Sequence, residues 1–136
     1  TNRGWSSLGN RSYGLERIRY QGETPFEIKE IHSKPDGFKF LFTKPIDPKS
    51  FTTESIKINS FTYEYSSRYG GDEIDTQTHQ FKIPTISDDG LSAEISISGL
   101  RESYVFEFLT KGVKSKDGAP LLHSDAWYTL NRIPKK

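Results

Sequence analysis

Residues 91–98 read Leu91-Ser92-Ala93-Glu94-Ile95-Ser96-Ile97-Ser98, and this stretch indicates the fold class more clearly than any other part of the chain. Apolar and polar side chains alternate at every position. Because successive side chains of a β-strand point to opposite faces of the sheet, the alternation predicts a strand with one face on a core and the other in water. Such half-buried strands are typical of antiparallel sheets.

The same period of two recurs elsewhere, and turn-forming residues separate the stretches that carry it. The repeats are Phe38, Phe40 and Phe42, and then Tyr104, Phe106 and Phe108. The turns are Lys34-Pro35-Asp36-Gly37, Ser87-Asp88-Asp89-Gly90 and Lys114-Ser115-Lys116-Asp117-Gly118. Proline presets φ in such a turn, and glycine can adopt a positive φ. Strands and turns at spacings of about ten residues predict an all-β, antiparallel sandwich or barrel.

Three segments depart from regular strands. A single helical turn is expected at Asp47-Pro48-Lys49-Ser50-Phe51, because Asp47 can cap it and Pro48 suits its first position. In residues 56–65 the apolar positions begin with Ile56 and Ile58 and then change parity, which a one-residue bulge would explain. Residues 1–14 contain three glycines and no period, so we expect an irregular leader that docks onto the sheet, followed by a short strand at residues 15–20.

The composition describes one domain of ordinary size. The chain has 136 residues, of which 32% are hydrophobic and 13% aromatic, so aromatic rings must supply much of the core. No apolar run approaches the roughly 18–20 residues of a membrane-spanning helix. The absence of cysteine excludes disulfides and thiolate metal sites. A net charge of +1 gives no general attraction to nucleic acid. We therefore expect a soluble domain with neither a membrane span nor a nucleic-acid partner.

Catalytic and metal chemistry find little support in the sequence. The histidines, His32, His79 and His123, do not have the spacing of a metal site, and no Gly-x-Ser-x-Gly elbow is present. The simpler interpretation is that the chain is not an enzyme. An acidic loop offers three carboxylates, Asp72, Glu73 and Asp75, and hard oxygen ligands suit calcium. It lacks the spacing of an EF-hand, so a solvated loop paired with Arg68 is the first interpretation and a calcium site the alternative.

Aromatic residues between positions 61 and 69 suggest a ligand site. The cluster comprises Phe61, Tyr63, Tyr65 and Tyr69, and Trp5 and Trp127 lie elsewhere. Flat aromatic faces stack on the apolar C–H patches of sugar rings, while polar side chains bond the hydroxyls. Alternating aromatic residues are, however, first of all core residues or cross-strand pairs. Packing is therefore the first interpretation, and a glycan site formed by Tyr63, Tyr65, Arg68, Tyr69 and Asp72 is the alternative.

Two segments resemble a known type of domain. They are Phe42-Thr43-Lys44-Pro45-Ile46-Asp47-Pro48-Lys49-Ser50 and Gly112-Val113-Lys114-Ser115-Lys116-Asp117-Gly118-Ala119-Pro120-Leu121. They resemble the strand exit F-x-x-P-[IV]-D and the late turn G-V-x-x-x-D-G-x-P-L of bacterial surface-layer-type immunoglobulin-like domains. The resemblance covers roughly residues 24–134, and it implies an immunoglobulin-like β-sandwich.

A second resemblance rests on other segments. They are Thr1-Asn2-Arg3-Gly4-Trp5-Ser6-Ser7-Leu8-Gly9, Tyr13-Gly14-Leu15-Glu16-Arg17 and Thr24-Pro25-Phe26-Glu27-Ile28-Lys29-Glu30, with Tyr63-x-Tyr65, Tyr69-Gly70, Glu73-x-Asp75 and Tyr128-Thr129-Leu130-Asn131-x-Ile133-Pro134. They are similar to the C-terminal part of exported bacterial proteins with a sorbosone-dehydrogenase-like β-propeller, often joined to cytochrome c. The chain has no Cys-x-x-Cys-His haem motif, so the resemblance implies no redox chemistry for these residues.

Together these observations give a specific hypothesis. Residues 1–22 are expected to connect to a preceding domain, and residues 23–136 to form the immunoglobulin-like sandwich. The expected function is that of a non-catalytic accessory module of a secreted or periplasmic sugar-dehydrogenase-like protein, packed on its propeller. Arg3 and Trp5 are the expected docking anchors, because large aromatic and arginine side chains dominate binding energy at interfaces. A carbohydrate-binding module is the alternative.

Overall fold

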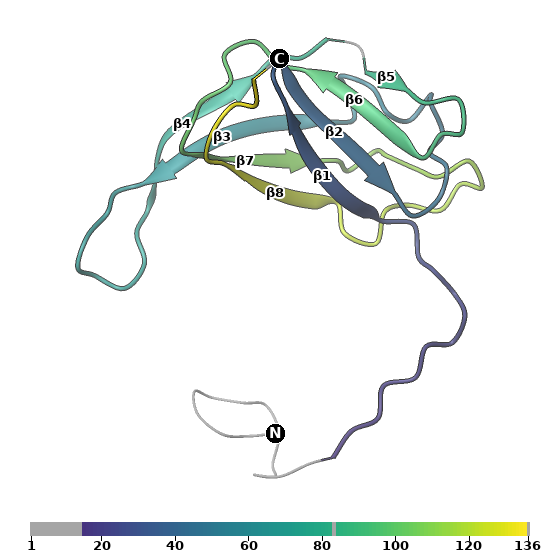
Figure 1. Cartoon of the computed structure of the whole chain (residues 1–136). Coiled ribbons are helices and arrows are strands. Elements are labelled where there is room, and N and C mark those ends of the chain that lie inside the picture. Colours follow the sequence, from purple (N-terminus) through teal and green to yellow (C-terminus); the bar gives the residue numbers. More distant parts are fainter. Residues whose placement is uncertain (1–14, 83, 136) are drawn as a thin grey trace.

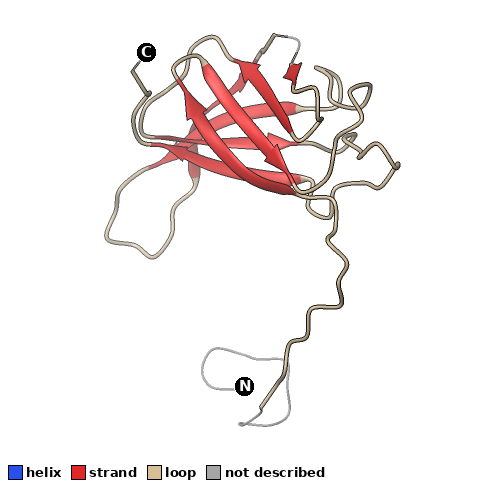
Figure 2. Ribbon diagram, turned by 45° about the vertical axis from the view of Figure 1, so that its right-hand side comes forward, coloured by secondary structure: helices blue, strands red, loops and turns tan. Residues whose placement is uncertain are grey.

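The computed structural model describes residues 15–82 and 84–135 as a β-sandwich (Figures 1 and 2). Its strands are β1 (Ile28–Lys34), β2 (Gly37–Phe42), β3 (Lys57–Tyr63), β4 (Glu73–His79), β5 (Thr85–Ile86), β6 (Ser92–Ser96), β7 (Tyr104–Leu109) and β8 (Asp125–Leu130). One sheet has the order β1-β2-β6-β5 and the other the order β4-β3-β7-β8, and all strand pairs are antiparallel. In the part of the chain described, no helix is long and apolar enough to span a membrane.

The strand order is that of an immunoglobulin-like domain. Strands β1, β2, β6 and β5 occupy the positions of immunoglobulin strands A, B, E and D, and β3, β7 and β8 those of C, F and G. Strand β4 is an additional edge strand beside C. The prediction of an all-β, antiparallel immunoglobulin-like sandwich is therefore confirmed.

Phenylalanine rings fill the space between the sheets. The ring of Phe38 lies 5.0 Å from those of Phe106 and Phe108 and 5.4 Å from that of Tyr128. Most of the predicted inward residues in and beside β2, β6 and β7 are buried, as the alternation required: Phe38, Phe40, Phe42, Ala93, Ile95, Ile97, Phe106 and Phe108. Two differ: Leu91 is exposed, because β6 begins one residue later, and Tyr104 at the start of β7 is half-buried. Edge-to-face contacts such as these stabilise a core beyond its area alone.

The turns confirm the sequence pattern, with one difference in mechanism. Gly90 and Gly118 adopt positive φ angles of 72° and 85°, as a turn glycine can. Gly37 is not among the glycines of positive φ. It is required for a different reason, since a Cβ atom on Gly37 would lie 1.9 Å from the carbonyl oxygen of Ile95. The predicted turn at Asp47 is also present, with Ser50 N donating to Asp47 O over 2.9 Å.

The bulge expected in residues 56–65 lies in the neighbouring strand instead. Strand β3 pairs with β7 in continuous register from Lys57 to Phe61, so its own alternation is unbroken. Against β4, one residue lies between Ser60 and Thr62 but two lie between their partners Gln77 and Ile74, which places the additional residue in β4. Asp75 adopts a positive φ of 53° there. The parity changes because Phe61 and Tyr63 lie on the outer face of the sheet, whereas Ile58 faces the core.

Two segments form little or no strand. Before the predicted turn at Ser87-Asp88-Asp89-Gly90, the chain forms only the two-residue strand β5 and a single bridge between Phe81 and Ile97. The prediction of a strand at residues 15–20 is wrong, because this segment, called the arm below, pairs with no other described residue and extends away from the sandwich (Figure 1). Every arm side chain is exposed. The leader expected to dock onto the sheet, residues 1–14, lies outside the described residues.

Candidate functional site

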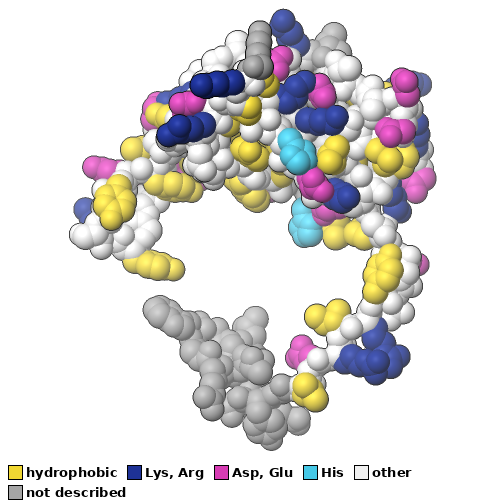
Figure 3. All heavy atoms as spheres, in the orientation of Figure 1, with side chains coloured by type: hydrophobic (Ala, Val, Ile, Leu, Met, Phe, Trp, Pro, Cys, Tyr) yellow, Lys and Arg dark blue, Asp and Glu magenta, His cyan; other side chains and the backbone are white. Residues whose placement is uncertain are grey.

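The tyrosine loop, residues 64–72, connects β3 to β4 and projects from one end of the sandwich (Figure 1). Gly70, at a φ of 77°, helps to turn the chain. Tyr65 and Tyr69 are fully exposed, and Tyr63 at the end of β3 is half exposed. The space-filling view shows hydrophobic side chains standing on this projection (Figure 3). Large aromatic rings in full contact with water are available to bind a partner, since nothing in the fold uses them.

The loop contains two adjoining hollows. The larger has a volume of about 570 Å³ and is lined by Tyr63, Glu64, Tyr65, Ser66, Arg68, Gly70 and Gly71. The smaller, about 200 Å³, shares Arg68 with it and adds Asp72 and Ile74. The structure thus brings Tyr63, Tyr65 and Arg68 together, with Asp72 beside them. Tyr69 lines neither hollow.

The ring of Tyr63 stands on that of Phe61. Their centroids are 5.5 Å apart and their planes are nearly perpendicular, at 84°. Phe61 is buried, so this residue packs as the simpler sequence interpretation expects. Among the exposed tyrosines of the described structure, only Tyr63 packs against another aromatic ring. The positions of the Tyr65 and Tyr69 rings therefore depend on the conformation of the loop.

The acidic residues of this region do not converge. The Asp75 carboxylate accepts a hydrogen bond of 2.6 Å from the Tyr104 hydroxyl and forms an ion pair with Arg101. The hydrogen bond from Tyr104, and then the Arg101 guanidinium, lower the pKa of Asp75 below its ordinary value. Arg101, rather than the expected Arg68, is therefore the partner of the acidic loop. In residues 15–82 and 84–135, no group of three or more histidine and carboxylate side chains is placed to hold a metal ion.

A polar network continues from Asp75 into the sandwich. Arg101 Nη1 donates to the Asp75 carbonyl oxygen over 2.8 Å and to Ser60 Oγ over 3.3 Å. Ser60 Oγ also lies 2.7 Å from Nε2 of the buried His79. Burial lowers the pKa of His79; the backbone of Ser98 opposes this and the Arg101 charge adds to it.

This serine and histidine do not form a catalytic pair. Ser60 is fully buried, so no substrate can reach its hydroxyl. In the part of the chain that the structure describes, no carboxylate bonds His79 Nδ1, whereas a catalytic histidine is oriented there by a carboxylate. The other two histidines are exposed, and each is bonded to a glutamate, His32 to Glu30 and His123 to Glu27. The network therefore ties β4 to the rest of its sheet.

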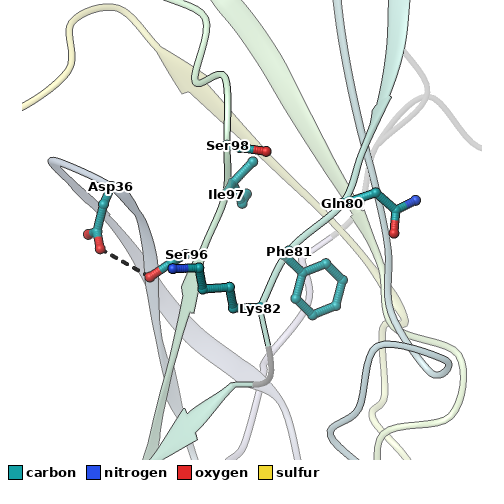
Figure 4. Close-up of a pocket in the computed structure, with 7 residues that line it drawn as sticks. All are labelled: Asp36, Gln80, Phe81, Lys82, Ser96, Ile97 and Ser98. Atoms are coloured by element: carbon teal, nitrogen blue, oxygen red, sulfur yellow. Dashed lines mark hydrogen bonds between the residues drawn. The ribbon is translucent and has the colours of Figure 1, made fainter.

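A third hollow lies at the edge of the other sheet, with a volume of about 380 Å³ (Figure 4). The Phe81 ring and Ile97 supply its apolar surface, and Lys82 extends toward Ser96. The Asp36 carboxylate accepts a hydrogen bond of 3.0 Å from Ser96 Oγ. With its carboxylate already bonded and neither a histidine nor a second acid in its lining, the hollow offers no acid–base pair.

Sequence reasoning did not place Trp127, which lies on the outer face of the second sheet. It pairs with Glu107 across β7 and β8, and its side chain is 57% exposed. Glu107 accepts a hydrogen bond of 2.8 Å from Asn59, whose own oxygen accepts one of 2.9 Å from Thr78. The alternation of Ala126, Tyr128 and Leu130 was the available signal, because it places Trp127 on the opposite face. Arg3 and Trp5, the predicted docking anchors, lie outside the described residues.

Comparison with known proteins identifies the fold. No protein-family model matches the chain, and no curated protein matches it significantly. The crystal structure of the S-layer protein rSbsC(31-844) superposes with a TM-score of 0.60 at 20% identity, covering 79% of this chain and 14% of that one. The N-terminal part of the bacterial S-layer protein SbsC gives a TM-score of 0.60 at 20% identity, covering 79% and 24%. The structure of domains 1-6 of the surface layer protein SbsC superposes with a TM-score of 0.57 at 19% identity, and the match covers 78% of this chain and 14% of that one.

These matches correct one expectation. The assignment to sorbosone-dehydrogenase-like proteins is wrong, because the solved structures that the chain resembles belong to a surface-layer protein. The chain corresponds in length to about one seventh of rSbsC, as a single domain would. What the likeness establishes is a β-sandwich resembling domains of a bacterial S-layer protein.

Proposed function

We propose that the chain is a non-catalytic β-sandwich module of a larger, exported cell-surface protein, and that its role is to pack against and position its neighbours. Residues 23–136 form the module, and residues 1–22 connect it to a preceding domain. The observation that carries this proposal is the arm, in which Leu15, Ile18 and Tyr20 lie in water. A segment with three large apolar side chains that its own sandwich does not cover is suited to an interface.

Two further observations support the proposal. The fold resembles domains that make up a small part of a bacterial S-layer protein, which supports a multidomain parent and a place outside the cell. The ionisable groups of the sandwich act as structural ties: Lys34 and Lys39 pair with Glu94, and Arg101 pairs with Asp75. An inert framework of this kind suits positioning better than catalysis.

Protease treatment of intact cells that produce the parent protein tests this role. The tyrosine loop contains Arg68 and is exposed, so trypsin should cut there without lysis if the domain faces the outside. Replacing Arg68 with glutamine removes that site and serves as the matched control. Cleavage that occurs only after lysis would contradict the proposed location.

A glycan site in the tyrosine loop is the second candidate. It is favoured by the exposure of Tyr65 and Tyr69 beside the hollow that Arg68 lines. Two such rings can stack on sugar faces while the guanidinium bonds hydroxyl or carboxylate groups. Retention of the full chain on immobilised polysaccharides, compared with Tyr65→Ala and Tyr69→Ala variants, tests this candidate. Equal retention of all three proteins, or none by any, would count against it.

A further inference from the structure

Within the described residues, an exposed apolar segment and a sheet edge with little protection match each other. We propose that the arm, residues 15–20, adds as a β-strand to the open edge of β8 in a second copy of this chain. This inference rests on the proposed positioning role and deepens it, because it names the surface and the partner. Strand addition of this kind uses backbone hydrogen bonds for affinity and side chains for specificity.

The arm has the properties of an unpaired strand. Leu15, Ile18 and Tyr20 are 101%, 98% and 76% exposed. No backbone hydrogen bond joins the arm to another part of the described chain. Ile18 and Tyr20 fall on one side of an extended chain, together with Glu16 near its start, and Arg17 and Arg19 fall on the other side with Leu15. Branched and aromatic residues favour strands.

Three of the four sheet edges carry features that discourage pairing. Strand β5 has only two residues. Strand β1 has a register shift between Ile28 and Glu30 and bears charged residues. Strand β4 has the additional residue near Asp75, with its positive φ and its carboxylate. Short strands, bulges and edge charges are the means by which proteins prevent unwanted strand addition.

Strand β8 lacks these features. Six consecutive residues, from Asp125 to Leu130, pair with β7 without a shift, and Asp125 is the only charged one. The carbonyl oxygens of Ser124 and Leu130 accept hydrogen bonds from Thr110 and Ser103, on the β7 side. Since backbone groups alternate along an antiparallel strand, those of Asp125 and Trp127 point to the open edge. The next outward carbonyl oxygen, that of Thr129, already accepts a hydrogen bond of 3.2 Å from Asn131 N.

The side chains of the arm suit this edge. Ala126, Tyr128 and Leu130 face the core, so an added strand can extend that layer with Ile18 and Tyr20. Arg17 and Arg19 then lie on the outer face, where Trp127 offers a ring for a cation–π contact and Asp125 a carboxylate. Both segments are six residues long, and their charges are opposite.

The position of the arm favours a second copy over its own sandwich. The Phe26 carbonyl oxygen accepts a hydrogen bond of 3.0 Å from Leu122 N, which fixes the chain near the start of β8. From there toward the N-terminus, the arm runs away from the sandwich (Figure 1). It is therefore presented to another molecule, and exchange of the same segment between identical chains closes a symmetric pair.

Sedimentation equilibrium of the 136-residue chain over a range of concentrations tests the inference. We expect a concentration-dependent rise from the mass of one chain to that of two. Ile18→Pro removes an amide donor from the arm and should weaken association at least about tenfold. Trp127→Lys places a charge on the β8 edge and should weaken association to a similar degree.

Lys39→Ala, on the outer face of the other sheet, is the matched control and should associate normally. At concentrations at which both proteins are single chains, the melting temperature of Ile18→Pro should equal that of the original chain, because the Ile18 side chain is 98% exposed.

Cross-linking then identifies the contact, because the chain has no cysteine of its own. A mixture of Arg19→Cys and Trp127→Cys chains should form a mixed disulfide, whereas Arg19→Cys with Lys39→Cys should not.

A single-chain mass at every concentration would overturn the inference, as would a dimer that Ile18→Pro leaves intact. Slow hydrogen exchange of arm amides in a monomer would also overturn it, because the arm would then occupy its own β8. None of these results alters protease access on intact cells, so the two proposals can fail separately.

Discussion

The Asp75 carboxylate on β4 accepts a hydrogen bond of 2.6 Å from the Tyr104 hydroxyl on β7, reaching across β3, which lies between them. The Arg101 guanidinium, whose central carbon lies 3.6 Å from the centre of the Tyr104 ring, pairs with the same carboxylate. The additional residue in β4 and the positive φ of Asp75 allow this reach. One irregularity of the strand thus discourages outside pairing and also ties the edge to its own sheet.

Tyr104→Phe should weaken the fold in a pH-dependent way. The Tyr104 hydrogen bond is the largest cause that lowers the pKa of Asp75 below 3.8. A lowered folded pKa means that the stabilisation is present above the unfolded value and is lost as pH falls through the folded value. The variant should therefore unfold at lower urea concentration than wild type near neutral pH, and the difference should shrink well below about pH 4. A difference that stays constant down to the lowest pH would show that the carboxylate is not involved.

His79 should make the protein less stable in mild acid. Burial lowers the pKa of His79 below its model-compound value of 6.5, so the unfolded chain binds a proton more readily than the folded one. Stability should then rise with pH up to about 6.5 and fall as pH drops below it. His79→Gln keeps a polar group near Ser60 but cannot titrate, so its urea midpoint should change less between about pH 7 and pH 5.5. The exposed His32, replaced by glutamine, is the control.

Calcium should leave the melting temperature unchanged at millimolar concentration. The Asp75 carboxylate is already held by Tyr104 and Arg101, and Asp72 and Glu73 alone supply too few oxygens for the six to eight that calcium takes. A ligand that binds only the folded state raises its stability by mass action, so calorimetry with and without calcium reports binding directly. A calcium-dependent rise in melting temperature that Asp72→Asn removes would contradict this expectation.

Truncating a central core ring should cost far more than truncating a loop ring. Phe38 is fully buried between Phe106, Phe108 and Tyr128, and Phe38→Ala should lower the free energy of unfolding by about 3–5 kcal/mol. Tyr65→Ala should change it by no more than about 0.5 kcal/mol, because the ring is fully exposed. Guanidinium unfolding of both variants measures the contrast. A large loss in Tyr65→Ala would mean that the loop packs on the sandwich.

Strands whose side chains alternate between core and water could be predicted from the sequence. Features that depend on contacts between distant segments could not. Residues 91–98 alternate strictly, so their strand was predictable to within a residue or two. The arm also reads as a strand, but no edge of its own sandwich pairs with it. The change of parity at Phe61 was visible, yet sequence could not show whether a bulge or an outer-face position caused it. Exposure of the tyrosine loop was only the alternative interpretation, because alternating aromatic residues are first of all core residues or cross-strand pairs. The tie between Asp75 and Tyr104 depends on how β4 and β7 meet.

Gly37→Ala should destabilise the sandwich by about 3 kcal/mol, at the upper end of overpacking losses. The added Cβ atom would lie 1.9 Å from the Ile95 carbonyl oxygen, which belongs to the backbone and cannot rotate away. Because Gly37 pairs with Ser96 at the start of β2, relief requires the two strands to separate there. Gly71→Ala is the matched control: its Cβ atom would meet only the Glu64 carbonyl oxygen, at 3.7 Å, and its φ is not positive. We expect Gly71→Ala to be neutral or slightly stabilising, since alanine restricts the unfolded chain. Equal urea midpoints for the two variants would show that β2 and β6 lie further apart at this turn.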